Sequence, residues 1–262
     1  MTVQPLLDQL WADYIALAPQ AERIHALLGA RGETIVNDHV ALRGLGITNL
    51  GIAALARPFE AVGYREQPAR YRFDDKKLVA RYWKHPEPGV PKVFISELCV
   101  GELSAGAQRM IEALVAQLPA AFCDRSDLPW AGRPWRTTRA TYDALLAESE
   151  YAAWLAAFGF RVNHFTVAVD ALTTFGSLAE LDAFLVANGF VLNAAGGAIK
   201  GTPADKLEQS STLADVIAVD FADEREPAML PSVYYEFAKR YDGFEGFVPT
   251  SADKIFESTN AR

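Results

Sequence analysis

The stretch VNDHVALRGL, residues 36–45, places one histidine in an apolar segment and an arginine four positions after it. A second stretch, RVNHFTVAVD at residues 161–170, again holds a single histidine among valine, phenylalanine and threonine. Both patterns predict buried strands. Because side chains alternate along a strand, His39, Ala41 and Arg43 share one face of the first stretch. The small Ala41 leaves space for a ligand between His39 and Arg43.

The two stretches begin two segments with the same predicted order of elements. Residues 33–101 are predicted as a strand, a helix and three strands, and residues 159–262 repeat this order. Residues 102–158 are mostly helical in pattern, and residues 4–29 form one or two amphipathic helices. The pattern predicts one α+β domain over residues 1–262, in which two βαβββ modules form a central curved mixed sheet with flanking helices. After its helix, the second module is expected to have strands within residues 189–202, 210–221 and 231–241.

The composition is that of an ordinary globular protein, with 50% hydrophobic and 22% charged residues. A net charge of -8 without a block of basic residues argues against nucleic-acid binding. The N-terminus lacks signal-peptide features and no apolar run is long enough to span a bilayer, so we expect a cytoplasmic protein without a membrane partner. Cys99 and Cys123 are too few for a disulfide framework or a thiolate zinc site. Nothing in the sequence indicates the oligomeric state.

Two histidines and one acid are candidates for a metal site. His39 and His164 hold equivalent places near the start of each module, and two sheets that close around a common cavity would bring them together. The last strand of each module adds a lone acid among apolar neighbours, Glu97 in the first and Glu236 in the second, where an unpaired carboxylate would be costly. Two imidazoles and one carboxylate form the facial triad of non-haem Fe(II) oxygenases. The same ligands also suit zinc, manganese or nickel.

Two alternatives use the same residues differently. In the first, a metal-dependent isomerase or lyase on the paired-module fold uses both Glu97 and Glu236. In the second, His39 and His164 are hydrogen-bonded core residues of a non-enzymatic protein that binds a small dicarboxylate. A separate interpretation makes Arg43 a structural residue, paired with Glu97 or Asp38. Nucleotide-binding glycine loops and the serine-hydrolase elbow are absent from the sequence.

Six motifs are distributed over nearly the whole chain: NDHVALRGL, KVFISEL, RVNHFTV, EQSSTLADVIAVDF, YYEFAKRY and GFVPTSADKIFEST. Together they resemble the 2-oxoadipate dioxygenase/decarboxylase family, also called hydroxyglutarate synthase. The last motif is unusually specific. The family is distantly similar to the vicinal-oxygen-chelate enzymes, so the resemblance implies a vicinal-oxygen-chelate-like fold around a metal cavity. Many family members are longer than 262 residues, which leaves a different 2-oxo acid open as substrate.

The resemblance also implies site residues and a reaction. His39, His164 and Glu236 would bind Fe(II), and Arg43 would act in catalysis as the anchor of a substrate carboxylate. 2-Oxoadipate and O2 would give 2-hydroxyglutarate and CO2 in lysine catabolism. Further residues are implied near the substrate or behind the metal ligands: Val248, Thr250 and Ser251 closing over the other end of the substrate, Glu97 bonded to His39 or Arg43, and Gln209, Ser210 and Ser211 along the pocket.

Overall fold

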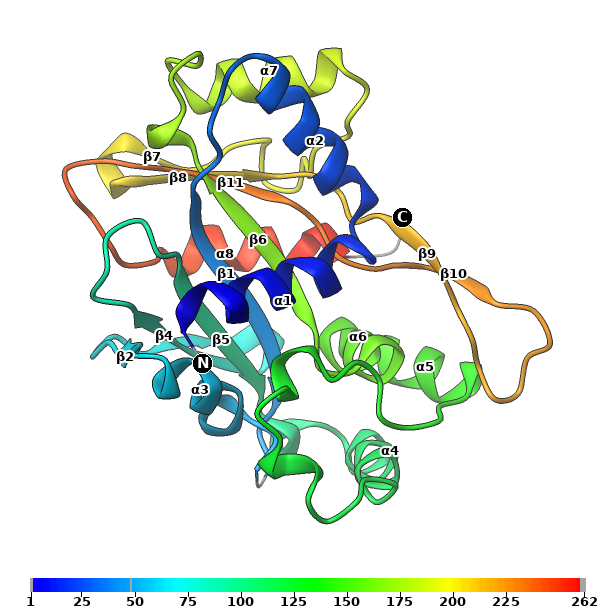
Figure 1. Ribbon diagram of the computed structural model, residues 1–262. Coiled ribbons are helices and arrows are strands. Elements are labelled where there is room, and N and C mark those ends of the chain that lie inside the picture. Colours follow the sequence, from blue (N-terminus) through cyan, green and yellow to red (C-terminus); the bar gives the residue numbers. More distant parts are fainter. Residues whose placement is uncertain (1, 48, 260–262) are drawn as a thin grey trace.

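The computed structural model describes residues 2–47 and 49–259 (Figure 1). A sheet of nine strands lies at its centre; in Figure 1 helix α1 crosses in front of it and helix α8 lies behind it. None of the described helices is long and apolar enough to cross a membrane. The helices are α1 (Val3–Ile15), α2 (Pro19–Ala30), α3 (Ile52–Ala61), α4 (Ala105–Val115), α5 (Arg139–Leu146), α6 (Glu150–Phe158), α7 (Leu178–Ala187) and α8 (Pro249–Ile255).

The pairing of the strands in the first half of the sheet recurs in the second half. β1 pairs parallel with β5, and β5 pairs antiparallel with β4; likewise β6 pairs parallel with β11, and β11 pairs antiparallel with β8. β1 and β6 join the halves as an antiparallel pair. The predicted α+β fold with a central mixed sheet is confirmed, and the recurring pattern supports the two modules that we propose. These strands are β1 (Asn37–Leu45), β2 (Arg65–Glu66), β3 (Tyr71–Phe73), β4 (Leu78–Lys84), β5 (Lys92–Leu98), β6 (Val162–Ala168), β7 (Lys200–Thr202), β8 (Leu207–Ser211) and β11 (Glu236–Arg240).

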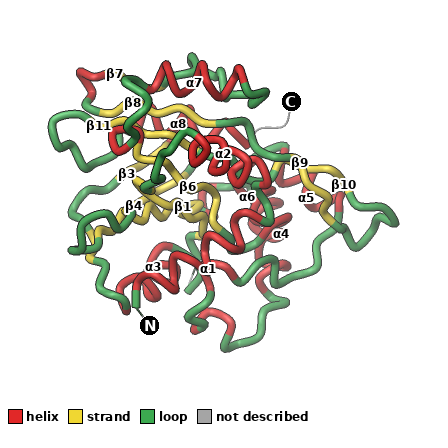
Figure 2. The backbone as a smooth tube through the Cα atoms, turned by 45° about the horizontal axis from the view of Figure 1, so that its top comes forward, coloured by secondary structure: helices red, strands yellow, loops and turns green. Residues whose placement is uncertain are grey.

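The second half differs in detail from the expected strands. The stretch 210–221 does not form one strand: β8 ends at Ser211, and β9 (Val216–Val219) pairs with β10 (Ala228–Pro231) in a separate ribbon. Figure 1 and Figure 2 show this ribbon away from the central sheet, beside α5. The stretch 189–202 contributes only β7, because Gly196 and Gly197 adopt positive φ values of 70° and 103° that end an extended strand.

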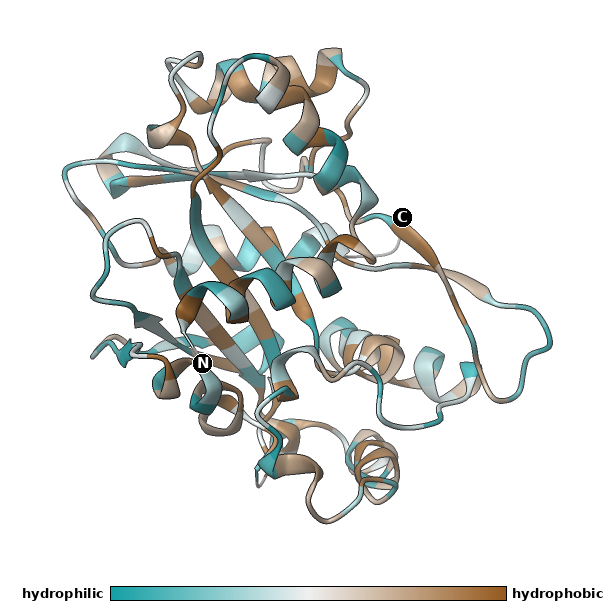
Figure 3. Cartoon of the chain, viewed as in Figure 1, coloured by the Kyte–Doolittle hydropathy of each residue, from teal (hydrophilic) through white to brown (hydrophobic). Residues whose placement is uncertain are grey.

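Buried aromatic residues fix the segment that leads into β11. The hydroxyl of Tyr14, on α1, donates a 2.6 Å hydrogen bond to the carbonyl of Tyr234, and the indole of Trp154, on α6, donates to the carbonyl of Ser232. Both aromatic side chains are buried, and burial of one large apolar side chain contributes about 1.5–3 kcal/mol. Figure 3 shows the apolar residues along the central strands against which these helices pack. The backbone just before Glu236 is therefore held from two helices.

Glu97 holds the start of α3. Its Oε2 atom accepts a 2.7 Å hydrogen bond from the backbone N–H of Ile52, the first residue of that helix. A carboxylate at a helix N-terminus also interacts favourably with the helix dipole. The expectation that Glu97 bonds to His39 or Arg43 is therefore wrong. Side chains alternate between the two faces of β5. Ser96 therefore lines the cavity, whereas Glu97, on the opposite face, contacts α3.

Replacing Glu97 tests this capping role. Glu97→Ala should lower the free energy of unfolding by about 1 kcal/mol, the usual loss for a helix cap, and should leave metal content unchanged. Chemical denaturation and metal analysis of the same sample check both statements. Loss of bound metal with unchanged stability would contradict the assignment.

Candidate metal centre

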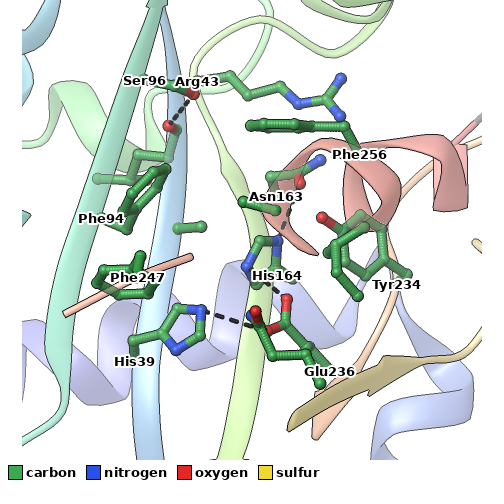
Figure 4. Close-up of a pocket in the computed structure, with 15 residues that line it drawn as sticks. His39, Arg43, Phe94, Ser96, Asn163, His164, Tyr234, Glu236, Phe247 and Phe256 are labelled. Atoms are coloured by element: carbon green, nitrogen blue, oxygen red, sulfur yellow. Dashed lines mark hydrogen bonds and ion pairs between the residues drawn. The ribbon is translucent and has the colours of Figure 1, made fainter. Parts of the chain in front are cut away.

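Three strands bring His39, His164 and Glu236 together. In the sheet register Thr166 lies between β1 and β11, opposite His39 on one side and Glu236 on the other, while His164 lies opposite Ala41. Ligand atoms of the two histidines and the glutamate lie within 4.8 Å of one another. Figure 4 shows the three side chains converging on one point of the cavity. Their exposed fractions are 2%, 5% and 1%, so water reaches them poorly.

A β-bulge precedes each histidine. The pairing of β1 with β6 shifts register at Asp38 and again at Asn163. Asp38 Oδ2 lies 2.7 Å from Nδ1 of His39, and Asn163 Oδ1 lies 3.0 Å from Nδ1 of His164. Bulges re-aim side chains next to active sites. Because Nδ1 of each ring is held, Nε2 is directed toward the other ligands, which is the usual arrangement of metal-binding histidines.

The electrostatics of the cluster fit a metal ion. Burial, together with the neighbouring charges of His39 and Arg43, holds the pKa of His164 well below its ordinary value, and neutral imidazole is the metal-binding form. Burial raises the pKa of Glu236, although the charge of His39 and a hydrogen bond from Gln209 counteract this. Glu236 Oε2 lies 3.1 Å from Nε2 of His164, yet it has no hydrogen-bond partner among the described residues. A buried carboxylate oxygen is costly in that state, and a metal ion bound here would remove the cost.

Asp38 links the metal-binding region to the loop before α8. Burial alone would raise its pKa, but hydrogen bonds from His39 and Arg240 outweigh burial and hold the pKa of Asp38 well below its usual range. The guanidinium of Arg240 also donates to two backbone carbonyls of the loop, 3.2 and 2.7 Å away. Phe247, in the same loop, packs edge-on against the ring of His39 at 4.9 Å. Asp38 therefore positions His39 and does not pair with Arg43.

Phe94 occupies, in the first half of the sheet, the place that Glu236 has in the second. Ala41 pairs with Phe94, and Thr166 pairs with Glu236; Ala41 and Thr166 each lie two residues after the histidine of their strand. The matching position thus carries a ring in one half and a carboxylate in the other. In the described chain the cluster has three protein ligands, and Glu97 is not one of them. This argues against the isomerase interpretation, which required both acids.

Arg43 lies farther along the same cavity and is one of its lining residues. Its Nη1 donates to Glu150 and its Nη2 to the hydroxyl of Thr259, both at 3.0 Å. The guanidinium also lies 4.9 Å from the ring centroids of Tyr151 and Trp154. Nε has no partner within the part of the chain that the structure describes. The edge of the guanidinium formed by Nε and Nη2 therefore has an unused donor, the N–H of Nε, that a carboxylate could accept from.

In the segment after Phe247, the residues that line the cavity are not the ones expected from the sequence. Val248, Thr250 and Ser251 are not among the lining residues, and Thr250 is exposed. The lining is provided by Ala252, Ile255 and Phe256. Helical spacing explains the difference, because α8 begins at residue 249 and presents positions three and four apart on one face.

Of the three remaining expected residues, one lines the cavity beside Glu236 and two lie outside it. Gln209 lines it and donates a 2.6 Å hydrogen bond to Glu236 Oε1. Ser210 bonds to Asp182, and Ser211 contacts the hydroxyl of Ser258; neither serine lines the cavity.

Several lining residues were not predicted from the sequence. They include Phe94, Asn163, Phe247 and Phe256. One signal was available for Asn163: each histidine follows a residue with a short acceptor side chain, as Asp-His in the first module and Asn-His in the second. The bulge that turns this neighbour toward the histidine ring depends on strand pairing, so the sequence pattern does not reveal it.

A family model described as 2-oxoadipate dioxygenase/decarboxylase matches residues 5–126 and 130–242. The chain belongs to this family. A 2-oxoadipate dioxygenase/decarboxylase, chloroplastic/amyloplastic, of Oryza sativa subsp. japonica is 34% identical over 283 residues, which cover 94% of this chain and 76% of the relative. The relatives named in this way are enzymes, which argues against a non-catalytic binding protein.

Solved structures share the fold of this chain, and one of them is a hydroxyglutarate synthase. The crystal structure of the hydroxyglutarate synthase in complex with 2-oxoadipate from Oryza sativa is 31% identical, covers 98% of this chain and 93% of its own, and has a TM-score of 0.89. A protein of Shewanella frigidimarina NCIMB 400 is 45% identical, with coverage of 94% and 98% and a TM-score of 0.89. A glyoxalase superfamily protein of Ralstonia eutropha JMP134, at 23% identity and a TM-score of 0.78 over 94% of this chain and 85% of its own, shares the fold.

The metal cluster is tested by removing its members one at a time. His39→Ala, His164→Ala and Glu236→Ala should each abolish stoichiometric metal binding, because each removes one of three ligands. His25→Ala and His85→Ala are matched controls, since they change the two other histidines of the chain, which lie outside the cluster. Metal analysis after anaerobic loading with Fe(II) gives the stoichiometry. One iron per chain in any of the three ligand variants would contradict the assignment.

Proposed function

We propose that this protein is an Fe(II)-dependent dioxygenase/decarboxylase that converts 2-oxoadipate and O2 into 2-hydroxyglutarate and CO2. One oxygen atom of O2 would enter the new carboxylate and the other the hydroxyl group. The observation that carries the proposal is the buried cluster of His39, His164 and Glu236, with Arg43 in the same cavity. As the family resemblance implies, we place the reaction in lysine catabolism; from the two cysteines we expect a cytoplasmic enzyme.

The metal would be held by His39, His164 and Glu236, and Fe(II) bound there supplies the activation of O2. The protein's own contribution is to keep these ligands oriented. Gln209 holds one oxygen of Glu236, and the bulge residues hold Nδ1 of each histidine. Three protein ligands leave positions for a chelating 2-oxo acid and for O2.

Apolar rings would exclude water from the reacting end of the substrate. Phe94 and Phe247 line the cavity, and their ring centroids are 4.7 Å apart. The Phe247 ring also packs against His39. A site closed in this way protects a reactive intermediate from water and strengthens electrostatic contacts within it.

Arg43 would anchor a carboxylate of the substrate away from the metal. Glu150 holds Nη1 of the guanidinium, so the plane of the fork is fixed before substrate binds. A carboxylate at Nε and Nη2 would gain two charge-assisted hydrogen bonds. With one end of the substrate at the metal and the other at Arg43, the carbon chain between them would be held next to the reacting centre.

Oxygen uptake by the Fe(II)-loaded protein with 2-oxoadipate tests the reaction. We expect consumption of O2 together with release of CO2 and 2-hydroxyglutarate, identified by mass spectrometry. Uptake without CO2, or no uptake by protein that holds one iron per chain, would contradict the proposed reaction.

Arg43→Ala tests the anchor. It should keep the iron and lower kcat/KM about 100-fold or more, since removal of one partner from a buried charge contact costs about 2–5 kcal/mol. Arg81→Ala, at a partly exposed position on β4, is the control and should have no such effect. Metal content and thermal unfolding are measured on both variants. Loss of iron in Arg43→Ala would overturn the assignment of Arg43 as a substrate anchor.

A further inference from the structure

Two buried donors in the cavity have no hydrogen-bond acceptor among the described residues. The side chain of Tyr234 is 0% exposed and that of Asn163 is 1% exposed. Both line the cavity, and Figure 4 shows them directed into it. Within the described residues, the Tyr234 hydroxyl and the Asn163 Nδ2 have no hydrogen-bond partner. A buried polar group in this state has lost its hydration without replacement, and a ligand oxygen in the cavity would offset that cost.

Both donors lie near the metal cluster, on the side toward Arg43. The ring of Tyr234 stacks on the ring of His164, with centroids 4.7 Å apart and an angle of 26° between the planes. The register shift leaves Asn163 opposite the step from Ala41 to Leu42 on β1, between the positions of His39 and Arg43. A substrate that extends from the metal to Arg43 would pass both groups.

The charges in the cavity show which end of the substrate requires these donors. At the metal, two positive charges would meet the carboxylate of Glu236 and one carboxylate of the substrate, which gives a balanced sum. At the other end, Arg43 is already neutralised by Glu150, 3.0 Å away. A second substrate carboxylate would therefore leave a net negative charge in a buried place, where neutral donors would add to the stabilisation that Arg43 supplies.

We propose that the Tyr234 hydroxyl and the Asn163 amide donate hydrogen bonds to the substrate carboxylate that Arg43 anchors, and so determine the preference for a dicarboxylic 2-oxo acid. This inference rests on the proposed function and deepens it. Arg43 supplies the charged contact, and the two neutral donors bind the oxygen lone pairs that Arg43 leaves free. A 2-oxo acid with a methyl group at that end would leave both donors unpaired and bind weakly.

Tyr234→Phe is the sharpest test, because it removes one oxygen atom and keeps the ring on His164. Tyr235→Phe is a matched control: that hydroxyl is also buried and without a partner in the described chain, but Tyr235 does not line the cavity and packs near Trp11. Both variants should fold and bind metal like the parent protein. Tyr234→Phe should lower kcat/KM for 2-oxoadipate about 10- to 100-fold, and Tyr235→Phe should leave it unchanged.

Substrate comparison locates the contact. 2-Oxohexanoate has the chain length of 2-oxoadipate without the second carboxylate, so Tyr234→Phe should change its turnover less than threefold. Asn163→Asp keeps the oxygen that faces His164, retains the metal, and should also lower kcat/KM for 2-oxoadipate at least tenfold more than for 2-oxohexanoate. Equal losses on both substrates, or equal effects of Tyr234→Phe and Tyr235→Phe, would overturn the inference.

A binding measurement separates this inference from the proposed function. The dissociation constant of 2-oxoadipate is measured on the Fe(II)-loaded protein without O2, for the parent protein and for both tyrosine variants. If the parent protein binds 2-oxoadipate but does not turn it over, the proposed reaction fails. A dissociation constant about 10-fold or more higher in Tyr234→Phe alone would still support the contact, and an unchanged constant would overturn it.

Discussion

The antiparallel pairing of β1 with β6 is the constraint on which the site depends. It places His39 and His164 on neighbouring strands at the centre of the sheet, and its two register shifts turn the preceding residues, Asp38 and Asn163, toward the histidine rings. Pairing without these shifts would leave Nδ1 of each ring without its present partner. The bulges thus combine two tasks, since they fix the direction of each imidazole and bring a further polar side chain to the ligands.

The two halves of the sheet are alike in topology and unlike in chemistry. The place of Glu236 in the second half is taken by Phe94 in the first. A second carboxylate there would occupy a coordination position and add a negative charge, whereas the ring leaves room and excludes water. Arg43, on β1, lines the part of the cavity away from the three ligands, and Glu150 orients its guanidinium. The departures from symmetry therefore account for a candidate metal site of three ligands, with space for the 2-oxo acid that we propose as substrate.

The sequence predicted the element order of the first half, the paired histidines and the α+β class, because alternation and the scarcity of histidine are local signals. It did not predict features that depend on how distant segments meet. Glu97 looked like a ligand candidate until the structure showed its contact with Ile52, 45 positions earlier in the chain. The cavity-lining residues of α8 depend on where that helix begins, and Asn163 enters the cavity through a bulge. The roles of these residues depend on three-dimensional contacts, which the periodicity of the sequence does not reveal.

The most direct test of the central claim is a calorimetric titration of 2-oxoadipate into the protein without O2, with and without Fe(II). If the 2-oxo acid completes the coordination of a metal held by the three ligands, its affinity must rise when Fe(II) is bound. The affinity for Fe(II) must then rise by the same factor when 2-oxoadipate is present, because the linkage is reciprocal. We expect one 2-oxoadipate per iron-loaded chain and much weaker binding without iron. Equal affinity in the two titrations would contradict a substrate bound at the metal.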